Sequence, residues 1–443
     1  MSINAEDGAR GTLVPGDRRP APERFNRRIA AASLIGTLVE GNDFVLYGLA
    51  AALVFPHVFF PSLGETAGTV ASLATLGVAF VARPFGSVLF GHFGDKYGRK
   101  ATLVVTLLSM GVCTTLIGFV PPATQIGATA PICVIVLRVV QGISAGGEWA
   151  GSTLFVAEHA PREKRGLYAM FPQIGHALPT AFSSAVFLVI GLMMSESSFN
   201  SWGWRVPFVA SSLLVGIGLY IRLKLDETPV FKREASRGVS KVPFLEAFKQ
   251  QPWQIIRGAG VALTTFALTY LASSYLANYG TTVLGFSRTS VLAVTLIAGL
   301  VYALATAASA LLSDRTGRRR MLGTAHIAGF AWVLVLFPIV NTRSFWAYVL
   351  ALAVTYLIAG LNYGAVGAFL PEQFRTRYRQ TATGISYNLT SVIGGGIVPL
   401  MAPIVIDLAG SSAFGILLAV ICAIAALCTF SLRETRNVNL DEV

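Results

Sequence analysis

The sequence predicts an all-α integral membrane protein whose twelve transmembrane helices form two six-helix bundles. Of its 443 residues, 54% are hydrophobic and only 13% are charged, whereas soluble domains are about 25% charged. Twelve apolar stretches are long enough to cross a bilayer, which takes about 20 residues. The same charged landmarks recur in both halves of the chain, as an internal duplication of a membrane-embedded unit predicts.

The twelve apolar stretches divide the chain into two halves with a polar segment between them. The stretches cover residues 29–54, 66–92, 101–121, 131–157, 165–194, 203–223, 255–283, 288–312, 321–340, 345–370, 380–407 and 411–431. The predicted parts are a cytoplasmic tail (1–28), an N-terminal six-helix bundle (29–223), a cytoplasmic linker (224–254), a C-terminal six-helix bundle (255–432) and a second cytoplasmic tail (433–443).

The net charge of +12 is distributed unevenly. Lys and Arg gather in the tails and in the even-numbered loops, and only Arg205, Arg288 and Arg343 lie in loops on the other side. This is the positive-inside pattern, which predicts that both termini are cytoplasmic. The charge is therefore explained by topology, and we expect no nucleic-acid partner. The amino tail has no apolar core before residue 29, so it is expected to be a tail and not a cleaved signal peptide.

Two charged turns, one in each half, are the most specific of the repeated landmarks. The residues Asp95, Gly98 and Arg99 of the first turn recur as Asp314, Gly317 and Arg318 in the second, and Gly91 opens the first turn. A second landmark pairs Glu158 and Arg165, after the fourth span, with Glu372 and Arg379, after the tenth. We expect each turn to contact the Glu and Arg landmark of the opposite half, with the Asp side chains favoured further by helix-end dipoles.

Three further stretches narrow the interpretation: Glu40–Gly48 in the first span, Arg138–Trp149 in the fourth, and Asp226–Phe231 after the sixth. Together with the turns, the spans and the linker, they resemble the major facilitator superfamily and, within it, the metabolite:proton symporter family. The resemblance covers about residues 28–435. It implies the major facilitator fold, a bacterial inner membrane location, and charged turns that close the cytoplasmic side during alternating access.

Members of that family take up organic acids, shikimate-like compounds, aromatic acids or zwitterionic osmolytes. We therefore predict proton-coupled uptake of a small organic carboxylate, with a zwitterion such as betaine or proline, or an exchange reaction, as the alternative. Osmosensing members carry a long carboxyl-terminal coiled coil, and this chain is expected to end soon after its last span. The fifth span lacks the repeated glycines of drug exporters, which favours uptake.

An enzyme is not expected, because the five His residues have no metal-ligand spacing and no phosphate-binding glycine loop is present. We predict no metal and no cofactor, with the proton as the coupling ion. The expected partners are the small-molecule substrate and the lipid bilayer, and the chain is expected to work as a monomer.

Glu40 and Asp43 are candidate proton-coupling groups because they lie inside the first span. An ionisable side chain at mid-membrane costs on the order of 3 kcal/mol, which makes it a functional candidate. In the superfamily's proton-coupled sugar carriers a span-one Asp faces a span-four Arg, so Arg138 is the expected partner of Asp43. A substrate anion could instead compete for Arg138 through a bidentate contact.

Other polar residues within the spans leave alternatives open. Arg83 either binds substrate or pairs with Glu40 or Glu148. Glu148 is about 15 Å along the helix from Arg138, so it either binds a charge on another helix or lies near the cytoplasmic end. His176 either relays protons or only packs. The expected substrate-binding residues are Arg138, Arg83, Tyr47, Gln141, Gln173, Tyr275, Asn278, Asn362, Tyr387 and Asn388.

Overall fold

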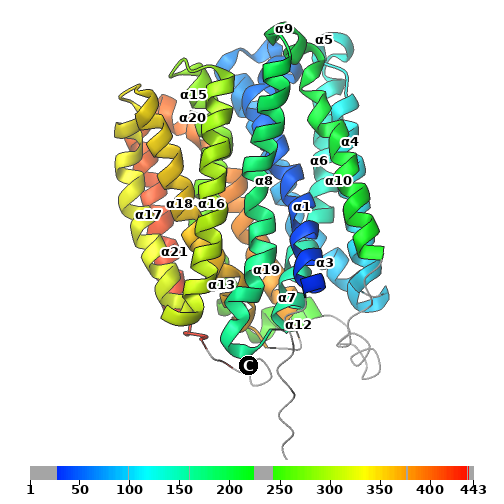
Figure 1. The fold of residues 1–443 in the computed structure, drawn as a ribbon, viewed down its shortest axis with the longest axis vertical. Coiled ribbons are helices and arrows are strands. Elements are labelled where there is room, and N and C mark those ends of the chain that lie inside the picture. Colours follow the sequence, from blue (N-terminus) through cyan, green and yellow to red (C-terminus); the bar gives the residue numbers. More distant parts are fainter. Residues whose placement is uncertain are drawn as a thin grey trace, which may run out of the picture.

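The protein is a bundle of helices that stand side by side along its longest axis (Figure 1). The computed structural model describes residues 27–97, 99–158, 160–223, 243–375, 378–436 and 438. Every regular element within these residues is a helix, and the described chain contains no strand. The prediction of an all-α protein is confirmed.

Each predicted span is occupied by helix within a few residues of its expected bounds. The first six are α1 (Arg27–Leu53), α3 (Glu65–Tyr97), α4 (Arg99–Phe119), α6 (Thr129–Ala145) with α7 (Glu148–Glu158), α8 (Arg165–Met193) and α10 (Arg205–Leu223). The last six are α13 (Pro252–Val261) with α14 (Leu263–Tyr270), η4 (Leu271–Leu276) and α15 (Ala277–Thr282), α16 (Arg288–Thr316), α17 (Arg318–Val340), α18 (Phe345–Phe369), α19 (Arg379–Ser391) with η7 (Val392–Ile397) and α20 (Val398–Ala409), and α21 (Ser411–Ser431).

Short helices connect these spans. They are α2 (Phe55–Phe59), η1 (Pro61–Leu63), α5 (Ala123–Ile126), η2 (Arg162–Lys164), α9 (Glu196–Ser198), η3 (Phe199–Gly203), α12 (Pro243–Gln250) and η5 (Pro371–Gln373). Helix α9 and helix α12 lie at opposite ends of the bundle (Figure 1). We call these the α9 end and the α12 end.

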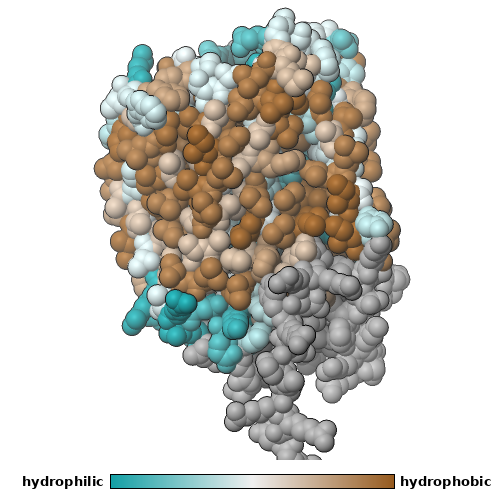
Figure 2. All heavy atoms as spheres, in the orientation of Figure 1, coloured by the Kyte–Doolittle hydropathy of each residue, from teal (hydrophilic) through white to brown (hydrophobic). Residues whose placement is uncertain are grey.

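The surface has the polarity of a membrane protein. Figure 2 shows apolar residues over the middle of the visible face and polar residues towards both ends. Eleven helical segments of the described chain are long and apolar enough to cross a membrane, and α1, which is 27 residues long, is the twelfth long helix. Leu304 and Leu427 are each 71% exposed, as lipid-facing side chains should be. The protein is an integral, multi-pass membrane protein.

Helix α12 lies inside the segment that the sequence predicted as a polar linker. Its eight residues pack on α13 and α19, with Ala247 buried and the rings of Phe244 and Phe248 5.0 Å apart. The sequence prediction missed this helix because a single short turn with Glu246 and Lys249 between polar neighbours carries too few apolar positions to stand out.

Glycines allow close contact between the helices of the first half. A Cβ atom on Gly146 would collide with the backbone oxygen of Arg83, and one on Gly142 would collide with that of Ala79. Small residues at this spacing let two helices approach within backbone contact, so both glycines serve helix packing. The fourth span is interrupted here, between Ala145 and Glu148.

The two halves meet along several helices. Helix α8 of the first half packs against α16 of the second (Figure 1), and α3 packs against η7. A Cβ atom on Gly299 of α16 would lie 2.5 Å from the backbone nitrogen of Ala181 in α8, so only glycine permits this approach. Both η4 and η7 are π-helical turns, which occur often at functional sites. Together these contacts bring charged residues of α1, α3 and α8 next to tyrosines of the second half.

Candidate functional site

A small cavity of about 30 Å³ lies between the two halves. Helices α1, α3 and α8 supply its charged and imidazole-bearing wall, and α14, α16, α18 and α19 supply the opposite wall. The lining residues are Gly41, Phe44, Val45, Arg83, His176, Thr265, Phe266, Thr269, Tyr270, Tyr302, Tyr363 and Tyr387. The cavity has room for about one or two water molecules and none for an organic acid.

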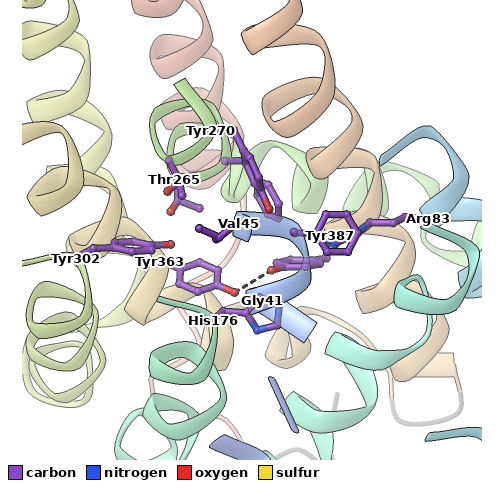
Figure 3. A pocket seen from close by; sticks show the side chains of 12 residues that line it. Gly41, Val45, Arg83, His176, Thr265, Tyr270, Tyr302, Tyr363 and Tyr387 are labelled. Atoms are coloured by element: carbon purple, nitrogen blue, oxygen red, sulfur yellow. Dashed lines mark hydrogen bonds between the residues drawn. The ribbon is translucent and has the colours of Figure 1, made fainter. Parts of the chain in front are cut away.

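Phenol groups from the second half converge on this cavity. Figure 3 shows the hydroxyl ends of Tyr270, Tyr302, Tyr363 and Tyr387 directed towards its middle. The hydroxyls of Tyr363 and Tyr387 lie 2.9 Å apart and share a hydrogen bond. The hydroxyl of Thr269, which also lines the cavity, has no partner among the described residues. This wall can therefore donate and accept hydrogen bonds to a polar ligand.

On the opposite wall, Glu40 lies between two basic side chains. Its carboxylate is 3.6 Å from Nη2 of Arg83 and 3.5 Å from Nε2 of His176. Neither Glu40 oxygen makes a hydrogen bond with a described residue, although the side chain is fully buried. The guanidinium of Arg83 also stacks on Phe44, 3.9 Å from the ring centre. Of the two alternatives for Arg83, the pairing with Glu40 is present, and Arg83 lines the cavity as well.

Arg138 is fully buried next to α1, but its partner differs from the expected one. Its Nη1 donates to Oε1 of Gln141 at 3.0 Å, and its guanidinium lies 3.9 Å from the ring centre of Tyr47. Gln141 in turn donates to the hydroxyl of Thr114 at 2.6 Å. No ion pair joins Arg138 to Asp43 in the described structure, and both Asp43 oxygens lack a hydrogen-bonding partner there. Gln141 and Tyr47 contact the guanidinium in place of Asp43, and its Nε and Nη2 have no hydrogen-bonding partner among the described residues.

Glu148 forms an ion pair with Arg222 of α10, whose other end donates to the backbone oxygen of Leu103. Of the two alternatives for Glu148, binding to a charge on another helix is confirmed. This pair is hydrogen-bonded directly and lies away from the cavity lining.

At the α12 end, four charged side chains form a cluster that joins the halves: Arg165, Asp314, Arg318 and Glu372. Glu372 lies 3.4 Å from Arg165 of the first half and 3.5 Å from Arg318 of the second. It also accepts a hydrogen bond from the Thr435 hydroxyl at 2.6 Å. Burial raises the pKa of the Glu372 carboxyl above its ordinary value, and the two guanidiniums and the hydroxyl offset part of this rise.

Asp314 caps a helix of the other half. Its two oxygens accept hydrogen bonds from the backbone amides of Gly166 and Leu167, at 2.9 and 3.0 Å, in the first turn of α8. Its carboxylate also lies 2.7 Å from Arg318. An anion at a helix N-terminus satisfies free amides and the helix dipole. The expected contact of Asp314 with the Arg165 region is therefore made, through backbone amides next to Arg165.

A second layer of contacts joins the halves between this cluster and the cavity. Asn388 donates to the backbone oxygen of Gly146 at 2.8 Å and also to the Ser87 hydroxyl. Gln173 accepts from the indole of Trp149 at 3.0 Å and donates to the Tyr363 backbone oxygen at 2.8 Å. Asn388 and Gln173, predicted as substrate ligands, join the halves and do not line the cavity.

The α9 end is closed as well. Asn278 of α15 donates to the backbone oxygen of Ala52 in α1 at 2.8 Å. Arg288 of α16 donates to Asn200 at 3.1 Å and lies 3.8 Å from Glu196. These contacts also connect the two halves, so the cavity is shut off from both ends of the bundle.

Other predicted ligands lie away from the cavity. Tyr275 packs near the α9 end, 6.3 Å from Phe414. Asn362 faces the interior of the second half, 3.3 Å from a ring nitrogen of His326. Arg379 donates to the backbone oxygen of Phe374. Tyr47, Gln141 and Arg138 form a buried layer outside the cavity lining. Predictions for Gly91, Asp95, Gly98, Arg99 and Glu158 fall outside the residues whose side chains the structure describes.

The polar lining residues that the sequence analysis missed include Thr265, Thr269 and Tyr302. Thr265 and Thr269 are four apart and so share a helix face with each other. Tyr302 is the only tyrosine in its otherwise apolar span. A polar aromatic in the middle of a span was the available signal for Tyr302, and the periodicity of the hydroxyls was the signal for the threonines.

The chain is similar to known transporters over nearly its whole length. Residues 34–398 match the family model of the Major Facilitator Superfamily. The chain is 37% identical to the inner membrane metabolite transport protein YhjE of Escherichia coli, over 98% of this chain and all of the relative. It is 33% identical to the shikimate transporter of Escherichia coli, over 93% of this chain and 95% of the relative.

Two further similarities concern a more distant relative and the fold. The chain is 30% identical to the proline/betaine transporter of Escherichia coli, over 94% of this chain and 84% of the relative. The solved structure of the proton:xylose symporter XylE superposes with a TM-score of 0.74 at 18% identity, covering 94% of this chain and 97% of that one. At this identity the likeness shows the fold alone.

Proposed function

Because the chain belongs to the major facilitator superfamily, a family of membrane transporters and not of enzymes, we propose that it carries a small organic carboxylate together with a proton into the bacterial cytoplasm by alternating access. The α12 end is the cytoplasmic end in this proposal. The positive-inside distribution of Lys and Arg supports that orientation, and the name of a relative 37% identical, an inner membrane metabolite transport protein, supports the inner membrane as the location.

The observation that carries the proposal is the pair of buried carboxyl groups on α1. Glu40 and Asp43 are 0% and 1% exposed, and none of their four oxygens has a hydrogen-bonding partner in the described chain. A buried charge without donors is strongly disfavoured, so these groups gain most from a proton or from a nearby cation. Intramembrane carboxyls of this kind are typical of proton relays in transporters.

Alternating access is supported by the two closures around one cavity. Contacts between the halves shut the α12 end and the α9 end at the same time, and the enclosed space is about 30 Å³. A carboxylate substrate needs one closure to open and the cavity to widen. We assign the structure to an intermediate in which the halves are in contact at both ends of the bundle.

The chemistry of the lining favours an anionic ligand with hydrogen-bonding groups. Arg83 and His176 provide the basic wall, and four tyrosine hydroxyls provide the other. The similarity to the shikimate transporter agrees with a carboxylate that also carries hydroxyls.

A zwitterion is the second candidate. The cavity is rich in aromatic rings, including Phe44 and Phe266, and such rings bind quaternary ammonium groups through their faces. The similarity to the proline/betaine transporter favours this candidate. Here too the substrate carries a carboxylate, so the basic wall keeps its role.

Uptake into proteoliposomes tests the proposal. Radiolabelled shikimate, benzoate, succinate, proline and glycine betaine are offered with and without an acidic exterior. We expect one carboxylate to accumulate above its external concentration only when the pH gradient is present. Equal uptake with and without the gradient, or accumulation of none of the five, contradicts the proposal.

A further inference from the structure

The contacts of Glu40 are unusual for a buried carboxylate. Its oxygens lie 3.5 Å from His176 and 3.6 Å from Arg83, and neither contact is a hydrogen bond. Charge-assisted hydrogen bonds between such groups are normally about 2.7–2.9 Å long. Nε of Arg83 and both ring nitrogens of His176 also lack a hydrogen-bonding partner among the described residues. Three buried polar groups are therefore adjacent and unsatisfied at once.

The second buried ion pair of the same half behaves differently. Glu148 and Arg222 are directly hydrogen-bonded, and Arg222 also donates to a backbone oxygen. Loose geometry is therefore not a general property of buried charges in this protein. It is specific to the pair of basic groups that faces the cavity.

Arg83 and His176 line the cavity, whereas Glu40 does not. Glu40 lies within 3.6 Å of Arg83 and 3.5 Å of His176 but is itself outside the cavity lining. A carboxylate that enters the cavity meets both hydrogen-bond donors before it meets Glu40. The two anions must then compete for the same donors.

We infer that Arg83 and His176 form the binding site for the substrate's carboxylate, and that Glu40 takes up a proton as this site fills. This inference rests on the proposed function and adds to it the route by which binding is coupled to the proton. The substrate anion draws the two basic groups towards the cavity. Glu40, buried and deprived of its counter-charges, is then far more stable as the neutral acid.

The step balances in charge and atoms. One carboxylate enters, one hydronium ion from the bulk solution transfers its proton to a Glu40 oxygen and is left as water, and no covalent bond of the protein breaks. Arg83 faces one anion before the step and one after it.

The other charged and titratable groups described around Glu40 leave its carboxylate as the proton acceptor. Glu148 from α7 occupies Arg222 from α10, so this cation is not free to replace Arg83. Asp43 lies on the same helix, and Tyr363 of α18 and Tyr387 of α19 face the region as neutral phenols bonded to each other. Arg138 of α6 is held by Gln141. Among the described residues, only Arg83 and His176 lie within ion-pair distance of Glu40.

Proton uptake on binding tests the inference. Calorimetric titration of the purified protein, in buffers of different ionisation enthalpy, counts the protons taken up per ligand bound. The ligand is the compound of the five above that the parent accumulates most. We expect the parent to take up about one proton, with affinity weakening about tenfold per pH unit in the alkaline range. Glu40→Gln, an isostere of the acid, should bind equally well at low pH and lose this proton uptake and pH dependence.

Matched variants separate this inference from the proposed function. Glu65→Gln changes a carboxylate at an exposed position in the first turn of α3, away from the cavity lining, and should keep the proton uptake of the parent. His176→Gln, which leaves Glu40 in place, should weaken binding at least about fivefold, the effect of one lost hydrogen bond.

Unchanged proton uptake in Glu40→Gln, with accumulation intact in the parent, overturns the inference alone. Unchanged affinity in His176→Gln overturns the binding site. A parent that accumulates none of the five compounds overturns the proposed function, and the inference falls with it.

Discussion

Removing one negative charge at the α12 end should open that end of the protein. The change is Asp314→Asn, which keeps the size of the side chain and one acceptor oxygen. In the closed structure both Asp314 oxygens accept amides from the first turn of α8, at Gly166 and Leu167. These bonds exist only while the two halves are together, so their loss acts on the closed state.

The expected magnitude follows from these contacts. A hydrogen bond to a charged group is worth about 1.5–3 kcal/mol and one between neutral groups about 0.5–1.5 kcal/mol. A charge at a helix N-terminus adds about 0.3–1 kcal/mol. Arg318 keeps Glu372 as a partner in the variant, so the cost of burying the Arg318 charge is still partly offset. We expect a loss of about 2 kcal/mol, which raises the open population about thirtyfold.

Cysteine labelling measures this shift. Ala150 of α7 is 4% exposed and faces Gly384 of α19 across the halves, so Ala150→Cys reports opening at the α12 end. Ser274, fully buried and next to Gly48, reports opening at the α9 end when changed to Cys. The natural cysteines to be replaced are Cys113, Cys133, Cys422 and Cys428.

In Asp314→Asn we expect faster maleimide labelling at Ala150→Cys and slower labelling at Ser274→Cys. Asp407→Asn, at an exposed position of α20, serves as the matched control and should leave both rates as in the parent. Labelling rates in Asp314→Asn equal to those of the control would refute the role of the cap in closure.

Three other perturbations have expected outcomes. Burial raises the pKa of Glu372 in the closed cluster, so the closed state binds more protons than an open, hydrated one. Lowering the pH towards the raised pKa should therefore favour closure and slow the labelling of Ala150→Cys. Glu372→Gln should reduce this pH dependence. Asn278→Ala removes the bond to the Ala52 backbone, costs about 1 kcal/mol and should increase opening at the α9 end. Asn362→Leu, away from the cavity beside His326, should lower the melting temperature and leave substrate affinity unchanged.

Hydrophobic length predicted the fold well. A span must bury about 20 apolar residues whatever its neighbours are, so each span could be located within a few residues from the sequence alone. The duplication also placed Asp314 near Arg165, because both residues follow spans that end on the same side. Asp314 contacts the backbone amides of Gly166 and Leu167 next to Arg165, whereas the first turn and Glu158 lie outside the residues whose side chains the structure describes.

The cavity lining was harder to predict because each residue turns a helix by about 100°. Asn362 and Tyr363 are neighbours in α18, yet Tyr363 lines the cavity and Asn362 packs on His326. The sequence also does not show which of several nearby side chains bonds to a given partner. Arg138 was expected beside Asp43, but Gln141, one helical turn away, accepts its hydrogen bond.

The central claim is that substrate and proton move together, and proton flux measures it directly. Proteoliposomes containing a pH-sensitive dye are given an inward gradient of the transported carboxylate at equal pH inside and outside. We predict that the interior of parent vesicles acidifies as substrate enters, and that vesicles with Asp43→Asn show no acidification although they still exchange labelled for unlabelled substrate. Substrate entry into parent vesicles without acidification would contradict proton-coupled transport.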